Sequence, residues 1–179
     1  MTLHLVRHGL PLIEPTRAAA EWELDPAGFD DVWALRERLP SRGAWFCSPE
    51  PKAQQTAQLL TDSDVGIIDE LREHERGVTA WVEDPNEWHA VVRRVFTHPD
   101  EPSLPGWEPL SRTRERLLPA VRRILDVHGG LAGDRDVVLV GHATAWTLLV
   151  SELTGEPPDL ERWRTLGMPD VITVPSRLR

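Results

Sequence analysis

Two histidines follow short apolar segments of this sequence at positions suited to chemistry. His8 comes two residues after Leu3–Val6, and His142 comes two residues after Asp136–Val140. Apolar segments of this length, bounded by charged residues and glycine, are typical of buried strands. Ligands of open parallel sheets bind outside the carboxyl ends of the strands. We therefore expect His8 and His142 to meet at one edge of a sheet, where imidazoles can act as nucleophile, acid or base.

Two cations are expected at the same edge. Arg7 precedes His8, and Lys52 is placed in the first turn of a helix that Ser48 is predicted to cap after the strand Ala44–Cys47. A helix N-terminus carries partial positive charge, so a lysine there is unfavourable unless an anion is bound. Lys52 therefore indicates an anion that contacts both the lysine and the helix N-terminus. On position alone, the alternative for Lys52 is a solvated side chain at the surface.

A metal site is the alternative for this cluster. Two histidines and a carboxylate are plausible zinc or iron ligands. The sequence has no HExxH spacing, Cys47 is its only cysteine, and Arg7 and Lys52 would repel a cation. We therefore expect an anion site without a metal. The other histidines that we interpret as surface or core residues are His4, His89, His98 and His128.

Composition limits the class of protein and its partners. The chain of 179 residues suits a single domain spanning 1–179. No apolar run approaches the roughly 20 residues of a transmembrane helix, and Arg7 comes too early for a secretory signal. A net charge of −9 argues against non-specific binding to nucleic acid. We expect a cytoplasmic protein that binds a small anion and neither nucleic acid nor a membrane.

Short apolar strands alternate with helical segments along the chain. Further strands are predicted at Val65–Ile68 and, at a sheet edge, Val171–Val174. Pro119 is expected to kink or split one of the helices. The alternation predicts an α/β fold with a largely parallel central sheet. The predicted helices are Gly28–Leu39, Pro49–Thr61, Asn86–Thr97, Leu110–His128 and Ala143–Thr154.

Five segments resemble motifs of the histidine phosphatase, or phosphoglycerate-mutase-like, superfamily. The family's motifs are RHG, W-x-L-T-x-x-G, S-P-x-x-R-A-x-Q-T-A, L-x-E-x-x-x-G and a second histidine after a strand. One such motif alone would be weak support, but the five occur in the right order along nearly the whole chain. The resemblance implies a three-layer sandwich with helices on both faces of the sheet. The matching segments are Leu5–Gly9, Trp22–Gly28, Ser48–Ala57, Leu71–Gly77 and Val138–His142.

The resemblance also implies roles for residues of this chain. His8 would be the nucleophile that takes up a phosphoryl group, and Glu73 would be the general acid. Arg7, Lys52 and His142 would hold the phosphoryl oxygens, so His142 belongs to both the catalytic and the phosphate-binding residues. Neighbouring cations should lower the pKa of His8 and favour the neutral ring that attacks. No cofactor is implied, because protein cations neutralise the phosphoryl group.

Neighbours of Glu73 leave alternatives open. Glu75 is a rival for the acid, although the spacing to the next glycine favours Glu73. Arg72 is a possible substrate contact. His74 and Arg76 either add to the pocket or lie at the surface.

Three departures from the family pattern concern the pocket. Lys52, the only lysine among twenty basic residues, stands where most relatives carry Arg, so a point charge replaces a planar fork. Ala-Thr-Ala follows His142 in place of the common Gly-Gly. Segment 106–109 reads GWEP where many relatives carry Gly-Glu-Ser. Glu108 is therefore a possible substrate contact, whereas a proline cannot supply the hydroxyl of the serine.

The motifs together predict an activity. We expect a metal-independent phosphatase that hydrolyses a small phosphomonoester through a phosphohistidine on His8. One alternative is a phosphoglycerate-type mutase, which the short chain and the missing Gly-Glu-Ser disfavour. The other is a catalytically weak phosphoester-binding or regulatory protein, which the intact His8, His142 and Glu73 disfavour.

The Pro- and Trp-rich segment 81–107 is expected to cover the active site. Trp81, Trp88 and Trp107 either stack on the leaving group or pack the segment onto the core. Packing is the prediction for at least two of them.

Overall fold

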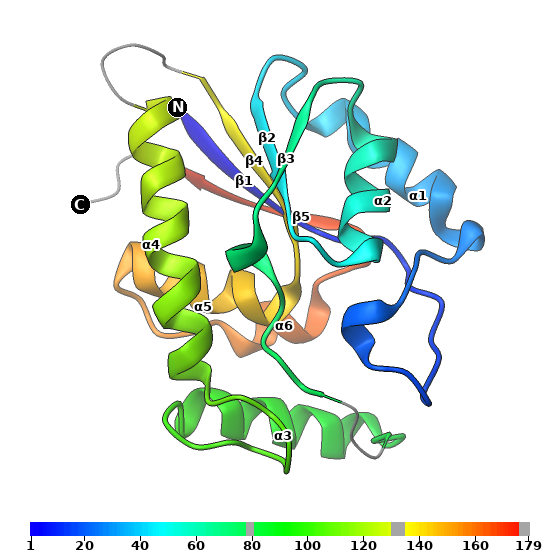
Figure 1. The fold of residues 1–179 in the computed structure, drawn as a ribbon, viewed down its shortest axis with the longest axis vertical. Helices are drawn as coiled ribbons and strands as arrows, with labels where there is room; N and C mark the ends of the chain where they lie inside the picture. The colour runs from blue at the N-terminus through cyan, green and yellow to red at the C-terminus, as the bar shows by residue number, and fades with distance from the viewer. Residues whose placement is uncertain (78–80, 130–134, 176–179) are drawn as a thin grey trace.

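A five-stranded sheet with the strand order β3-β2-β4-β1-β5 forms the centre of the molecule (Figure 1). The computed structural model describes residues 1–77, 81–129 and 135–175. Strands β1 to β4 pair in parallel, and β5 pairs antiparallel with β1 at the edge. The predictions of a largely parallel sheet and of a late edge strand are confirmed. The strands are β1 (Thr2–Arg7), β2 (Ala44–Cys47), β3 (Val65–Ile67), β4 (Val137–Gly141) and β5 (Asp170–Pro175).

Helices cover both faces of the sheet and complete the predicted three layers. In Figure 1, α1 and α2 lie on one side, α4 and α5 lie on the other, and α3 crosses the lower end. No helix within the described ranges is long and apolar enough to cross a membrane. The helices are α1 (Phe29–Leu35), α2 (Pro51–Leu60), α3 (Pro85–Thr97), α4 (Leu110–Gly129), α5 (Ala143–Thr154) and α6 (Leu160–Thr165). The short 3-10 turns are η1 (Ala19–Glu21), η2 (Pro26–Gly28), η3 (Arg36–Arg38) and η4 (Asp69–Leu71).

Alternating side chains of β4 hold the layers together. Val137 and Leu139 pack in a cluster with residues of α4 and α5. Val138 and Val140 pack on the opposite face with residues of α1 and α2. Burial of each such side chain contributes about 1.5–3 kcal/mol. A strand that is buried on both faces in this way gives rigid support to the residues at its carboxyl end.

Helix α4 is continuous through Pro119, so the predicted split is wrong, whereas the predicted kink stays a prediction. A proline inside a helix removes one backbone hydrogen bond and costs about 3 kcal/mol. The flanking Leu118 and Ala120 are buried in the core. Packing of this helical face maintains the helix against the local cost.

Ser48 does not cap α2, which corrects a second prediction. The N-cap is Glu50, and Pro51 occupies the first helical position. The Ser48 hydroxyl instead accepts a hydrogen bond from the backbone N–H of Glu50 at 3.3 Å. The carboxylate of Glu50 makes no capping hydrogen bond, because it contacts Lys52, His142 and the backbone of Glu73 instead.

Helix α6 has no counterpart among the predicted helices. Its six residues are too few for a helical period to be recognised. Asp159 caps it by accepting a hydrogen bond from the backbone N–H of Arg162 at 2.8 Å. Trp163, the buried residue of this helix, connects it to the core.

Candidate functional site

The carboxyl ends of β1 and β4 bring the two histidines together. The parallel register pairs Arg7 with Gly141, so His8 and His142 are the next residue of each strand. The His8 N–H donates to the Gly141 carbonyl at 2.9 Å, and the two ring centroids lie 5.3 Å apart. Both residues are buried, with 7% and 0% of their surface exposed. The prediction that the histidines meet at one sheet edge is confirmed.

Close packing explains the glycines beside both histidines. A Cβ on Gly9 would lie 2.6 Å from Cγ2 of Val32. A Cβ on Gly141 would lie 2.5 Å from the indole of Trp146. Larger residues do not fit at either position without displacing a core side chain. The Gly9 N–H also donates to Oγ1 of Thr56 at 2.9 Å, so the backbone that carries His8 is tied to α2.

The position of the proton on the His8 ring is fixed by its neighbour. Nδ1 lies 2.7 Å from the carbonyl oxygen of Gly9. A carbonyl oxygen can only accept, so Nδ1 carries the proton and Nε2 keeps its lone pair in the neutral ring. Burial lowers the pKa of His8 well below its usual value, and His142 and Lys52 add to the effect. The ring is therefore neutral at neutral pH, and burial is the largest cause.

The two ring nitrogens of His142 have different surroundings. Nε2 lies 2.8 Å from the Ser48 hydroxyl and 3.4 Å from Oε1 of Glu50. Nδ1 is buried without a hydrogen-bond partner among the described residues. Burial lowers the pKa of His142 well below its usual value, and Lys52 adds to this lowering. An unpaired buried nitrogen is costly, so Nδ1 is available to a polar atom of a ligand.

Lys52 is buried beside the histidines, so the solvated alternative is wrong. Its side chain is 6% exposed. Nζ donates to Oε2 of Glu50 and to the carbonyl of Ala19, each at 2.5 Å. An ammonium group has three hydrogens, so beside these two contacts one donor is free to bind a ligand.

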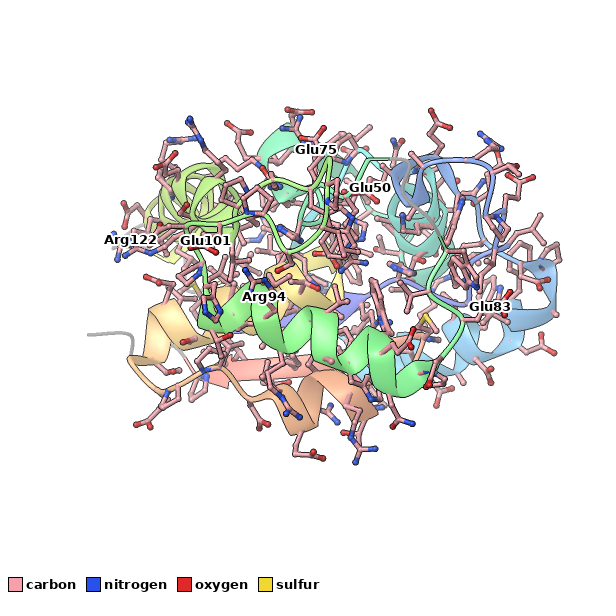
Figure 2. All side chains as sticks on the ribbon, turned by 90° about the horizontal axis from the view of Figure 1, so that it is seen from below. Glu50, Glu75, Glu83, Arg94, Glu101 and Arg122 are labelled. Atoms are coloured by element: carbon pink, nitrogen blue, oxygen red, sulfur yellow. The ribbon has the colours of Figure 1, made fainter. Side chains whose placement is uncertain are left out.

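Glu50 is the member of this cluster that sequence reasoning missed. Its carboxylate is 6% exposed and contacts both Lys52 and His142. Oε1 also accepts a hydrogen bond from the backbone N–H of Glu73 at 2.8 Å. From the sequence, Glu50 is predicted only to be an acidic residue near a helix start. Its position two residues before Lys52, within a motif segment, could have indicated that it belongs to the site. Figure 2 labels it near the loop that carries Glu75.

The carboxylate of Glu73 lies at the N-terminus of α5. It accepts hydrogen bonds from the backbone N–H groups of Thr144 at 3.1 Å and Ala145 at 2.9 Å. The backbone N–H of His74 donates to it at 3.0 Å. Burial acts to raise the pKa of Glu73, but the guanidinium of Arg76 and the hydrogen bond from His74 help to lower it overall. Glu73 is therefore ionised at neutral pH, as the helix N-terminus also favours.

Arg76 joins the cluster through Glu73. Its Nη2 lies 3.7 Å from Oε2 of Glu73 and donates to Oγ1 of Thr144 at 2.8 Å. The guanidinium also lies over the rings of Trp88 and Trp107, 4.9 and 5.3 Å from their centroids. The structure therefore places Arg76 beside the cluster, as the first of its two predicted alternatives states, and not apart from it at the surface.

The tryptophans of segment 81–107 differ in burial. Trp107 is buried with Val95 and Leu110, and Trp88 packs against this cluster, so the prediction of packing for at least two is confirmed. Trp81 is 46% exposed, with its ring 5.9 Å from that of Trp22. The contacts of Trp88 and Trp107 with the guanidinium of Arg76 bring the segment up to the cluster. That it covers the active site stays a prediction.

Arg7 and Arg72 occupy different surroundings. The Arg7 guanidinium donates through Nη1 to the carbonyl of Leu166 at 2.5 Å. Arg72 is 40% exposed and pairs with Asp69 at 2.6 Å, outside the contacts that link the histidines. Its role as a substrate contact stays a prediction. Within the described ranges, no group of three or more His, Cys, Asp or Glu residues could hold a metal ion.

Glu108 is held by the protein rather than left open to a ligand. Its Oε1 accepts hydrogen bonds from the Glu75 backbone N–H at 2.9 Å, from Thr113 at 2.7 Å and from Arg116 at 2.6 Å. These contacts fix the loop that follows Glu73. The side chain of Glu75 is exposed. A substrate contact by Glu108 stays a prediction.

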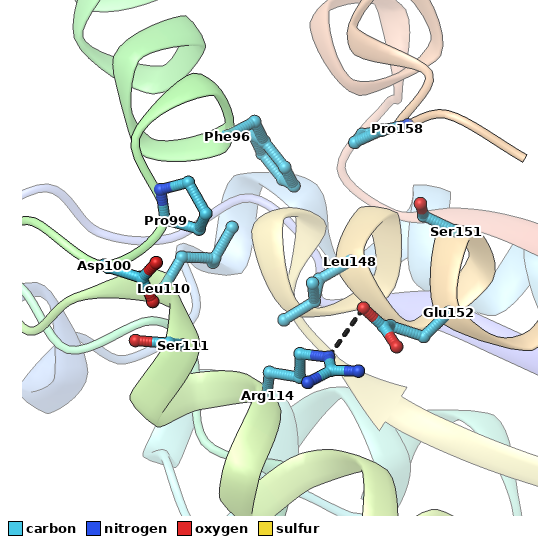
Figure 3. A pocket seen from close by; sticks show the side chains of 10 residues that line it. All are labelled: Phe96, Pro99, Asp100, Leu110, Ser111, Arg114, Leu148, Ser151, Glu152 and Pro158. Carbon is cyan, nitrogen blue, oxygen red and sulfur yellow. Dashed lines mark hydrogen bonds and ion pairs between the residues drawn. The ribbon is translucent and has the colours of Figure 1, made fainter. Parts of the chain in front are cut away.

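A separate hollow of about 350 Å³ lies between α3, the start of α4 and α5 (Figure 3). Its apolar lining includes Phe96 and Leu148. Arg114 and Glu152, two of its three charged residues, pair with each other at 2.7 Å, as the dashed line in Figure 3 marks. Neither histidine of the cluster lines this hollow. It is therefore distinct from the candidate site.

Known structures share this fold. A mycobacterial glucosyl-3-phosphoglycerate phosphatase is similar with a TM-score of 0.74 and 22% identity, covering 96% of this chain and 88% of that chain. A protein from Thermus thermophilus is similar with a TM-score of 0.66 and 28% identity, covering 100% of this chain and 96% of that chain. A mutant phosphoserine phosphatase from Entamoeba histolytica in complex with phosphoserine has a TM-score of 0.69 and 18% identity, covering 98% and 91%.

Sequence comparison identifies the family. None of the curated proteins compared matches this chain significantly. The family model for the histidine phosphatase superfamily (branch 1) matches residues 3–174. That match includes both strand-end histidines and the segments that surround them. Because it covers almost the whole chain, this protein belongs to the histidine phosphatase superfamily.

Proposed function

We propose that this protein is a metal-independent phosphatase that hydrolyses a small phosphomonoester through a phosphohistidine on His8. The observation that carries the proposal is the neutral, buried His8 ring, whose Nε2 keeps its lone pair beside His142. Family membership supports phosphoryl chemistry. Two proteins of similar fold are named as phosphatases of glucosyl-3-phosphoglycerate and of phosphoserine, which agrees with a phosphomonoester substrate.

In the first step, Nε2 of His8 attacks the phosphorus atom. The nitrogen–phosphorus bond forms while the ester oxygen–phosphorus bond breaks, and the bonding pair leaves with the alkoxide. The alkoxide takes a proton, for which Glu73 is the proposed donor. Arg7, Lys52 and His142 hold the phosphoryl oxygens, so positioning and charge neutralisation come from the protein.

In the second step, water attacks the phosphohistidine. The carboxylate of Glu73 takes a proton from the water as the oxygen–phosphorus bond forms. The nitrogen–phosphorus bond then breaks, and its electron pair returns to Nε2 of His8. The sum is ester plus water giving alcohol plus inorganic phosphate. The ionised state of Glu73 suits this step, because a base must be deprotonated.

The lowered pKa of Glu73 affects the two steps differently. Above that pKa, the fraction of protonated Glu73 falls tenfold for each pH unit. The first step needs this protonated form whenever the leaving group is a poor one. Aryl phosphates leave without protonation and avoid the requirement. Unless a proton enters the site from elsewhere, the proposed enzyme therefore favours good leaving groups at neutral pH.

The test is turnover of p-nitrophenyl phosphate in the presence of a chelator. The wild-type protein should be active and His8→Ala inactive, whereas the control His98→Ala should match wild type because His98 is exposed. Activity of His8→Ala near the wild-type level would overturn the assignment. Transfer of phosphate between phosphoglycerates, in preference to hydrolysis, would instead identify the mutase. Phosphate binding without turnover would identify the binding protein.

A further inference from the structure

Burial has the largest effect on the pKa values of the two histidines and Glu73, and five charged side chains in the described part of the chain act on these groups as well. Both histidine rings are neutral at neutral pH because their pKa values lie well below the usual range. Three positive and two negative side chains then leave one net positive charge. The positive residues are Arg7, Lys52 and Arg76, and the negative residues are Glu50 and Glu73.

Glu50 is responsible for this low net charge at the place where phosphoryl oxygens would bind. Its carboxylate lies 2.5 Å from Nζ of Lys52 and 3.4 Å from Nε2 of His142. Both are groups to which we assign phosphoryl oxygens. A phosphoryl dianion brings two negative charges into a cluster that offers one net positive charge. An uncompensated buried charge is costly, and a buried group commonly responds by gaining or losing a proton.

We propose that Glu50 couples phosphoryl binding to the uptake of one proton. The site then takes the singly charged phosphoryl group, or the doubly charged group together with a proton. This inference rests on the proposed function, because it places the phosphoryl group among these residues. His142 is suited to hold the proton, since its Nδ1 is unpaired and its Nε2 faces the carboxylate of Glu50.

The groups that face Glu50 make the effect measurable at mildly alkaline pH. They come from α2, from the end of β4 and from the loop after η4, and they are Lys52, His142 and Glu73. Burial holds the pKa of His142 low. Burial acts to raise the pKa of Glu73, but charges that include Arg76 and His142 lower it below its usual value. In the free protein, neither His142 nor Glu73 exchanges protons near pH 8, so a proton taken up there enters with the ligand.

The coupling has a consequence for catalysis. At neutral pH, Glu73 is ionised and lacks the proton that a poor leaving group needs. A proton that enters the site with the phosphoryl group supplies it. Glu50 is thus a specificity-determining residue that selects the charge state of the bound group.

The test is calorimetric titration of the full chain with inorganic phosphate at about pH 8.5, in two buffers that differ in protonation enthalpy. Inorganic phosphate is mostly dianionic there, so wild type should take up about one proton per phosphate bound. Glu50→Gln should take up almost none and should bind phosphate at least about tenfold more tightly, because the like charge is gone. The matched control is Glu152→Gln, which removes a carboxylate from the Arg114 pair and should behave as wild type.

Every outcome decides the matter. Phosphate binding by wild type without proton uptake overturns the inference, even if Glu50→Gln fails to fold. Unchanged uptake in Glu50→Gln, or no phosphate binding by either protein, overturns it as well. Turnover of p-nitrophenyl phosphate by the same preparation tests the proposed function separately. An active enzyme without uptake contradicts only the coupling, whereas an inactive protein that binds phosphate with one proton contradicts only the catalytic proposal.

Discussion

Two pairs of a carboxylate and a cation, one buried and one partly buried, contact the backbone of Glu73, and their cations are used differently. Glu50 pairs with Lys52 at 2.5 Å and accepts the Glu73 N–H. Glu108 pairs with Arg116 at 2.6 Å, and Arg116 donates to the Glu73 carbonyl at 2.8 Å. Glu73 is thus positioned by both pairs.

The terminal nitrogens of Arg116 are occupied. Nη1 donates to the carbonyls of Glu70 at 3.1 Å and Arg72 at 3.0 Å. Nη2 donates to the carbonyl of Glu73 and to the carboxylate of Glu108. The planar fork of an arginine suits this task, because it presents several donors in a fixed geometry. Lys52 instead keeps one donor free, so the Arg116 pair supports structure and the Lys52 pair can bind a ligand.

The largest expected effect concerns Glu73, where the two pairs meet. Glu73→Gln should slow hydrolysis of alkyl phosphates by about 10²–10⁴-fold and that of p-nitrophenyl phosphate far less, because general acid catalysis matters most for poor leaving groups. The measurement is kcat/KM for both substrates. Glu75→Gln is the matched control, because its side chain is exposed. Equal losses for both substrates, or a selective loss in the control, would show that Glu73 is not the acid.

The Lys52 pair should affect both catalysis and stability. Losing a charged hydrogen bond to the transferring group costs about 1.5–3 kcal/mol, so Lys52→Ala should lower kcat/KM by about one to two decades. Its Tm should also fall, because Glu50 is left buried without its partner. Arg94→Ala serves as the control, because Arg94 forms an exposed pair with Glu101 (Figure 2). Wild-type kinetics in Lys52→Ala would rule out phosphoryl binding by Lys52.

Lys52→Arg sharpens the comparison. Nζ fits between the carboxylate of Glu50 and the carbonyl of Ala19. A bulkier guanidinium cannot occupy this space unchanged, so the variant should keep the charge but not recover the full kcat/KM. Full activity would mean that only the charge at this position matters.

The Arg116 pair should affect stability more than catalysis. Arg116→Ala leaves Glu108 without its cation and should reduce the free energy of unfolding by about 1.5–3 kcal/mol, the range for hydrogen bonds to charged groups. Where the variant is still folded, kcat/KM should fall less than in Lys52→Ala. Denaturant unfolding and kinetics of the same samples measure both, with Arg114→Ala, from an exposed pair, as control. A variant with wild-type stability would contradict the structural role of Arg116.

The smallest expected effect is the response of kcat to acid. The pKa of His8 lies well below its usual value, mainly because the ring is buried. The proposed nucleophile therefore stays neutral as the pH falls through about 6.5 and is protonated only below the lowered pKa. With p-nitrophenyl phosphate, kcat should not fall between about pH 7 and pH 6. A half-maximal kcat near pH 6.5 would indicate that His8 titrates like a solvated histidine.

The sequence predicts the backbone that carries the site better than the contacts within it. The bounds of β2 and α5 were predicted as observed, because apolar patterning and flanking glycines and prolines determine them locally. The meeting of His8 and His142 follows from the strand ends alone. Helix α6 is too short for this reasoning, and at Pro119 packing outweighs the local preference.

The contacts of Glu50 and Arg116 depend on residues that are distant in the sequence. Arg116 bonds to carbonyls 43 to 46 residues earlier in the chain. The direction of the Glu50 side chain is determined by His142 and the backbone of Glu73. No local pattern specifies such partners, because they depend on how the layers pack.

The most direct test of the account is identification of the phosphorylated residue during turnover. Glu73→Gln should accumulate the intermediate by slowing its hydrolysis, and labelled p-nitrophenyl phosphate followed by rapid alkaline quenching should leave an acid-labile, base-stable phosphoryl group. Peptide mapping should place this group on His8, and His8→Ala should remain unlabelled. A label retained by His8→Ala, or mapped to another residue, would contradict the central claim.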